Sequence, residues 1–143
     1  MKKYFMSIAA YSQTPLAKKL GIKPGFKLRL INAPAHYLGL FTDMPAEVEI
    51  TSELKLRKDL IHFFAKNADE LQTLLLTLKN EIVPNGMIWV SWPKKASKVP
   101  TDVSEDMIRN LALSIGLVDI KVCAVDETWS GLKLVIPVKD RKG

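Results

Sequence analysis

The sequence of 143 residues contains one cysteine and no run of about 18 apolar residues. Cys123 cannot form an internal disulfide, which favours a reducing compartment, and its apolar neighbours predict a small buried residue. The apolar stretch at residues 4–10 follows two lysines, as in a signal peptide, but it is at the short limit for one. We therefore expect a cytoplasmic protein that has no membrane partner.

The sequence also lacks the motifs that identify common chemistries. It has no glycine-rich phosphate loop, no Walker-type lysine before serine or threonine, no histidine or cysteine spacing typical of a metal site, and no serine elbow. We therefore predict no catalytic residue, no metal and no cofactor.

Basic residues exceed acidic ones by 21 to 15, which gives a formal charge of +6 and an isoelectric point near 9.4. This excess is compatible with an anionic small molecule or a nucleotide as ligand, and more weakly with nucleic acid. The length predicts one domain over residues 1–143, with a frayed tail from about residue 139.

Three stretches have helical spacing and six have strand patterns. The helices are expected at 14–21, 67–82 and 102–116, and the strands at 26–31, 47–51, 60–64, 87–92, 118–125 and 132–136. Thr14 is expected to cap the first helix, which Gly21 ends. A capping box from Asn67 to Glu70 begins the second helix, and Pro84-Asn85-Gly86 ends it.

The remaining boundaries are set by short local signals. Pro34 opens a short helix that extends through Phe41, and either Asp102 or Ser104 caps the last helix. In the strand at 47–51, alternation predicts that Val48 and Ile50 point inward.

Alternating strands and helices predict an α/β fold of three layers, Rossmann-like, around a mostly parallel six-stranded sheet. Our preferred strand order is 2-1-3-4-6-5, with the last strand antiparallel. In such sheets, ligands bind at the carboxyl ends of the strands, where the strand order reverses. The segments after strands 1, 3, 4 and 5 are therefore expected to meet there.

The candidate ligand-binding residues come from these four segments and from the short helix after strand 1. They are Asn32, His36, Lys66, Trp92, Lys94, Lys95, Asp126, Glu127 and Trp129.

Each candidate has an alternative interpretation. The two tryptophans either pack together as an apolar lid or stack a planar ligand. The lysines after strand 4, which include Lys98, either form a solvated loop or bind an anion. Asp126 and Glu127 neutralise these lysines, form an acid/base pair or simply occupy a turn. His36 is interpreted as a surface residue and His62 as a packed strand residue.

Three stretches resemble a family of small bacterial proteins that is known only as a domain of unknown function. They are residues 14–25, 89–97 and 125–134, which read TPLAKKLGIKPG, WVSWPKKAS and VDETWSGLKL. This resemblance implies a bacterial cytoplasmic protein and brings no activity or catalytic residue with it.

The order of elements from strand 3 onward is also similar to the second half of S-adenosylmethionine-dependent methyltransferases. Those enzymes have an acidic, glycine-rich loop after strand 1 and an acidic residue after strand 2 that holds the ribose. Here the corresponding residues are 31–35, without glycine, and Thr51-Ser52, with Glu53 as a poor substitute. The resemblance therefore implies the scaffold without its cofactor site.

The sequence thus predicts a non-enzymatic, methyltransferase-like domain that binds a small anionic ligand or a macromolecular partner at the carboxyl edge of the sheet. One alternative is a divergent enzyme that uses the same edge. Another is a protein–protein adaptor.

Overall fold

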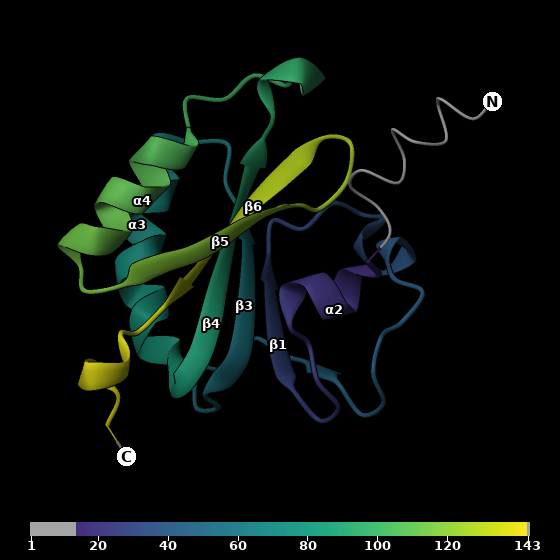
Figure 1. The fold of residues 1–143 in the computed structure, drawn as a ribbon, viewed down its shortest axis with the longest axis vertical. Helices are drawn as coiled ribbons and strands as arrows, with labels where there is room; N and C mark the ends of the chain where they lie inside the picture. The colour runs from purple at the N-terminus through teal and green to yellow at the C-terminus, as the bar shows by residue number, and fades with distance from the viewer. Residues whose placement is uncertain (1–13, 143) are drawn as a thin grey trace.

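The structure, a computed structural model, describes residues 14–142, so the apolar stretch at residues 4–10 lies outside the described range. A six-stranded sheet in the order β2-β1-β3-β4-β6-β5 forms the centre of the fold (Figure 1). Strands β2, β1, β3 and β4 are mutually parallel, and β6 is antiparallel to both of its neighbours. The predicted strand order and the antiparallel last strand are confirmed.

The strands are β1 (Lys27–Ile31), β2 (Glu49–Ile50), β3 (Lys58–Phe64), β4 (Ile82–Pro93), β5 (Val118–Ala124) and β6 (Trp129–Val135). The α-helices are α2 (Leu16–Leu20), α3 (Ala68–Leu78) and α4 (Glu105–Ser114). Short 3-10 helices occur at η1 (Tyr37–Leu40), η2 (Lys79–Glu81), η3 (Lys95–Ser97) and η4 (Val138–Asp140).

Each face of the sheet is covered by its own apolar cluster. Helices α3 and α4 pack on one face, and α2 lies on the other face together with η1 (Figure 1). Strand β4 contributes to both clusters, with Val90 facing the paired helices and Trp89 facing α2. The Trp89 indole N–H donates to the Leu20 carbonyl at 2.9 Å, which fixes the end of α2 against the sheet.

The second predicted helix ends earlier than its leucine spacing suggests. Helix α3 stops at Leu78, and Ile82 already begins β4, which continues through Pro84-Asn85-Gly86. This turn-like tripeptide lies in an irregular part of the ladder, between the pairs Lys58–Ile82 and Leu60–Met87. The prediction that the tripeptide ends a helix is therefore wrong, because it forms a bulge inside a strand.

The cap of the first helix also differs from the prediction. Pro15, not Thr14, is the N-cap of α2, and it makes no side-chain cap bond. The carboxylate of Asp43 instead accepts from the backbone N–H groups of Ala17 and Lys18, at 3.1 and 3.2 Å. A distant carboxylate thus replaces the local cap, and such a contact leaves no local signal in the sequence.

The strand β2 is shorter and less buried than predicted. It contains only two residues at the edge of the sheet, and Ile50 is 46% exposed, so the expectation that Ile50 points inward is wrong. Val48, just before the strand, is partly buried against the cluster under α2.

The predicted C-terminal tail contains η4, and the Arg141 side chain donates from Nε to the Ile136 carbonyl at 2.9 Å. No helix within residues 14–142 is long and apolar enough to cross a membrane.

Candidate functional site

A cavity of about 490 Å³ opens at the carboxyl ends of β1 and β3. We call it the switch-point cavity, because the strand order reverses at β1. Its lining comes from the β1 end, the β3–α3 junction and the start of β6: Asn32, Pro34, Phe64, Lys66, Asn67, Glu70 and Trp129.

Asn32 lies in the turn after β1 and adopts a left-handed conformation, with φ of 59°. Asparagine adopts this conformation more readily than other residues with a side chain. Its amide nitrogen donates to both carboxylate oxygens of Glu70, at 3.0 and 3.1 Å. The Glu70 carboxylate is therefore bonded to Asn32. The predicted capping box required it to reach back to Asn67 instead.

The start of α3 is nevertheless capped as the sequence predicts on one side. The Asn67 side chain accepts from the Glu70 backbone N–H at 2.9 Å. The Ala68 N–H donates to the Asp102 carboxylate at 2.7 Å, so Asp102 serves α3. Ser104 caps α4 by accepting from the Met107 N–H, which decides between the two predicted caps of that helix.

Two aromatic rings form one wall of the switch-point cavity. Phe64 and Trp129 meet edge to face, with ring centroids 5.0 Å apart. Trp129 is held by its backbone N–H, which donates to Asp126 Oδ1 at 2.8 Å. The cavity thus has a fixed apolar wall, while Lys66 is exposed at the junction before α3.

His36 and Asp126 connect the loop after β1 to the β5–β6 turn beside this wall. His36 Nε2 lies 3.4 Å from Asp126 Oδ2, and the His36 side chain is 63% exposed. The other Asp126 oxygen accepts from the Thr128 and Trp129 N–H groups. Asp126 therefore mainly shapes the turn, and occupying a turn is one of the three roles predicted for it.

A buried hydrogen-bond chain lies beneath this edge of the sheet. The Tyr37 hydroxyl is 2.9 Å from His62 Nδ1, and His62 Nε2 is 2.7 Å from Ser91 Oγ. Burial lowers the pKa of His62 from 6.5 to about 3 and raises the pKa of Tyr37. His62 is therefore a neutral core residue, packed within the strand as predicted, and its solvent exposure is zero.

A second cavity, of about 650 Å³, lies between the end of β4 and the start of α4. We call it the lysine cavity, because Lys94, Lys95 and Lys98 line it. Its two lining carboxylates, Asp102 and Glu105, both bond to groups elsewhere in the fold.

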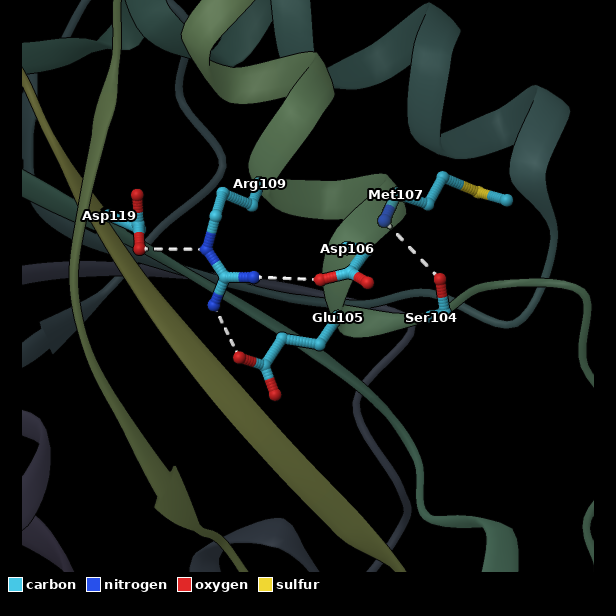
Figure 2. Close-up of polar contacts among 6 residues, drawn as sticks. All are labelled: Ser104, Glu105, Asp106, Met107, Arg109 and Asp119. Atoms are coloured by element: carbon cyan, nitrogen blue, oxygen red, sulfur yellow. Dashed lines mark hydrogen bonds and ion pairs between the residues drawn. The ribbon is translucent and has the colours of Figure 1, made fainter.

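Figure 2 shows how Glu105 is engaged. The Arg109 guanidinium lies between Glu105 and Asp106 on α4 and Asp119 on β5, and it contacts all three carboxylates. Its hydrogen bonds to Glu105 and Asp119 raise the pKa of Arg109. This cluster fastens α4 to the edge strand and turns the Glu105 carboxylate toward Arg109.

The predicted candidates therefore divide between two cavities. Asn32, Lys66 and Trp129 line the switch-point cavity, whereas Trp92, Lys94 and Lys95 line the lysine cavity. His36 and Asp126 pair with each other, and Glu127 is exposed in the turn and lines neither cavity.

The two tryptophans do not form a common lid. Trp92 belongs to the cluster under α3 and α4, and Trp129 belongs to the cluster under α2, so they lie on opposite faces of the sheet. Residues that pair across neighbouring strands point to the same face of the sheet, and successive residues of one strand alternate between the faces. Trp129 pairs with Pro93, so Trp92, the residue before Pro93, points to the other face. The two loops still touch, because the Lys94 N–H donates to the Thr128 carbonyl at 2.8 Å.

Phe64 and Glu70 line the switch-point cavity and were not predicted as site residues. Phe64 ends a buried strand, and Glu70 fits a capping box, so each residue has a sufficient local explanation in the sequence. A search for polar and aromatic residues within a few positions of every strand end would have found both.

A family model described as a protein of unknown function (DUF3052) matches residues 51–138, more than half of the chain. The chain belongs to DUF3052. The predicted resemblance to a bacterial domain of unknown function is consistent with this family. No curated protein matches the sequence.

Several of the solved structures similar to this DUF3052 chain are methyltransferases. A putative type 11 methyltransferase from Sulfolobus solfataricus has 16% identity and a TM-score of 0.59, covering 90% of this chain and 93% of that one. Magnesium protoporphyrin IX methyltransferase from Synechocystis PCC 6803, with bound SAM, has 9% identity and a TM-score of 0.57, covering 94% and 78%. Ribosomal protein L11 methylase from Lactobacillus delbrueckii subsp. bulgaricus has 11% identity and a TM-score of 0.56, covering 83% and 73%. At these identities the similarity establishes a Rossmann-like, methyltransferase-like fold.

Proposed function

We propose that this DUF3052 chain is a non-enzymatic binding domain that holds a small anionic ligand in the switch-point cavity. The observation that carries the proposal is that the Phe64–Trp129 aromatic wall and the exposed Lys66 line one cavity. Glu70 is the one carboxylate among the described lining residues. It keeps its charge but both of its oxygens accept from the Asn32 amide, whereas no ion pair within residues 14–142 involves Lys66.

The shape of the cavity supports a ligand with an apolar or planar part next to its negative charge. Phe64 and Trp129 offer a rigid aromatic wall, and rings of this kind stack or pack against planar groups. Lys66 supplies a positive charge at the exposed junction before α3. A nucleotide has both features, so nucleotides are the first ligands to test.

The residues present do not fit S-adenosylmethionine in the manner of the resembling enzymes. The turn after β1 has the Asn32 side chain where those enzymes have a glycine-rich loop, and this side chain bonds to Glu70. After β2 the chain reads Thr51-Ser52, and the Thr51 hydroxyl accepts from the Glu53 N–H within the same turn. We therefore propose no methyl-transfer step for this chain.

The ionisable side chains among the described lining residues are those of Glu70 and Lys66. Glu70 is engaged by Asn32, and His62 is sealed between Tyr37 and Ser91 beneath the surface. A general base must reach the proton that it removes, either directly or through one water. This arrangement supports binding without turnover.

The test is a thermal-shift and calorimetric titration of the whole chain with AMP, ATP, pyrophosphate, citrate, S-adenosylmethionine and S-adenosylhomocysteine. A ligand present at 100 times its Kd stabilises the folded state by about 2.7 kcal/mol, which raises the Tm by several degrees. We expect at least one nucleotide to do so. Lys66→Gln should weaken that binding about tenfold, because it removes a charge-assisted contact.

Lys55→Gln is the matched control, since Lys55 is an exposed lysine in the loop before β3 and does not line the cavity. It should leave the affinity unchanged. The absence of a Tm shift with every anion would contradict the proposal. The second candidate is a divergent enzyme, because one structural neighbour has bound SAM. Tight S-adenosylmethionine binding that is insensitive to Lys66→Gln would support this candidate instead.

A further inference from the structure

A third cavity, of about 260 Å³, lies at the amino ends of β3 and β4, at the opposite end of these strands from the switch-point cavity. Its lining comes from the residue just before β3, from η2 and the start of β4, from the residue just after β6, and from the C-terminal tail. We call it the tail cavity. The switch-point cavity lies at the other ends of β3 and β6, so the two sites share no lining residue.

Four cationic side chains line the tail cavity: Arg57, Lys79, Arg141 and Lys142. Three of them are held by backbone carbonyls rather than by carboxylates. Lys79 Nζ donates to the Ile115 carbonyl at 2.7 Å, and Arg141 Nε donates to the Ile136 carbonyl at 2.9 Å. Arg57 makes a longer contact of 3.5 Å with the Ile82 carbonyl.

A carbonyl fixes the position of a cation without neutralising its charge. No ion pair within residues 14–142 involves any of the four cations. Among the described residues, the lining contains one carboxylate, on the exposed Asp140. Glu81, which lies between two lining residues in the sequence, is paired instead with Arg29 and the buried Lys58, and neither of these lines the cavity.

The tail cavity is therefore a small, preorganised cationic site. We propose that it binds the phosphoryl group of a small phosphate-bearing molecule. The planar fork of an arginine matches phosphate oxygens in pairs, and Lys79 adds a point charge held by the Ile115 carbonyl. The volume is below the usual range of about 300–1,000 Å³ for drug-sized ligands, which favours a compact phosphate over a large molecule.

The test uses pyrophosphate as the probe and follows backbone amide shifts by NMR in the whole chain, at constant ionic strength. Saturable shifts should concentrate on the residues around Arg57, Lys79 and Arg141. Arg57→Gln should weaken binding about tenfold, because the lost contact is charge-assisted. This variant gives up only the long contact to Ile82, so the fold should persist, which the dispersion of the amide spectrum verifies.

Lys139→Gln is the matched control, because Lys139 is an exposed lysine of η4 that does not line the cavity. It should leave binding unchanged. Lys66→Gln should also leave pyrophosphate binding at this site unchanged, so the failure of one site is distinguishable from the failure of the other. Lys142→Gln provides a second variant within the lining, and it should weaken binding as well.

Three results would overturn the proposal. The first is an absence of saturable shifts around the tail cavity. The second is equal binding of succinate, which would remove the preference for phosphoryl groups. The third is preferential binding of a single-stranded RNA that Lys139→Gln weakens as much as Arg57→Gln does, because this pattern indicates a diffuse attraction of polyanions to a basic surface.

Discussion

Tyr37→Phe removes one hydroxyl from a hydrogen-bond chain that is closed to solvent. Tyr37 is 2% exposed, and His62 and Ser91 have no exposed surface. The phenylalanine ring keeps the edge contacts that Tyr37 makes with Phe41 and Phe64, at centroid distances of 5.2 and 5.7 Å. The substitution therefore tests the hydrogen bond with little change in packing.

The expected cost follows from the protonation of His62. Its pKa of about 3 keeps the imidazole neutral at pH 7, with one N–H donor and one acceptor nitrogen. Without the Tyr37 hydroxyl, Nδ1 loses its partner 2.9 Å away. A change of tautomer does not repair this loss, because Ser91 satisfies only Nε2 and Nδ1 stays unpaired either as donor or as acceptor. Leaving a buried polar atom unpaired costs about 1–3 kcal/mol.

Urea denaturation at pH 7 measures this cost, with Tyr37→Phe compared with the parent chain at equal m-value. A double-mutant cycle with His62→Phe separates the hydrogen bond from packing. Once both partners are apolar, the Tyr37 substitution should cost much less than it does alone. A cost below about 0.5 kcal/mol for the single variant, or strict additivity in the cycle, would refute the buried hydrogen bond.

Two further predictions concern stability. Because burial lowers the pKa of His62 from 6.5 to about 3, only the unfolded chain gains a proton there as the pH falls through this window. The free energy of unfolding should therefore fall by up to about 5 kcal/mol relative to pH 7 once the pH reaches the folded-state pKa. Parallel urea titrations at pH 7, 5 and 4 measure this pH dependence, and His62→Phe should lower it. An unchanged slope in the variant would contradict the assignment. Gly116→Ala should cost more than Gly25→Ala. Both glycines have positive φ, 87° and 79°, which costs alanine about 1–2 kcal/mol, but only at Gly116 would the new methyl group lie 2.6 Å from Lys79 Nζ. Equal Tm losses in the two variants would mean that Lys79 moves aside freely.

The strand order was predictable because it follows from local patterns and general rules of connection. The continuous apolar run from Met87 to Trp92 marks a strand buried on both faces, and in the structure Ile88, Trp89 and Val90 have no exposed surface. The capped helix α3 before it requires a parallel crossover, and Gly116 ends α4 with φ of 87°, as the sequence suggested. Once these elements are identified, the handedness of crossovers leaves few arrangements.

Contacts between distant loops were not predictable in the same way. Asp43 caps α2 from 26 positions away, and Asn32 reaches Glu70 across 38 positions. Neither contact has a spacing that a local pattern describes. The error at Pro84-Asn85-Gly86 has a different cause, because the tripeptide does read as a turn. A bulged ladder beside Lys58 accommodates it, and this depends on the partner strand.

The turn after β1 shows how a single side chain changes the lining of the candidate site. Asn32, the residue after β1, is left-handed with φ of 59°, a conformation that glycine adopts without strain, and the asparagine adds a side chain there. The backbone turn can therefore be kept, while the space that a glycine would leave open is filled by an amide. The Asn32 amide donates to Glu70 on the first turn of α3, so the lining carboxylate keeps its charge but has a hydrogen-bond partner. Because both effects arise from one side chain, Asn32→Gly should reopen the turn and release Glu70 together, without disturbing the strands that define the fold.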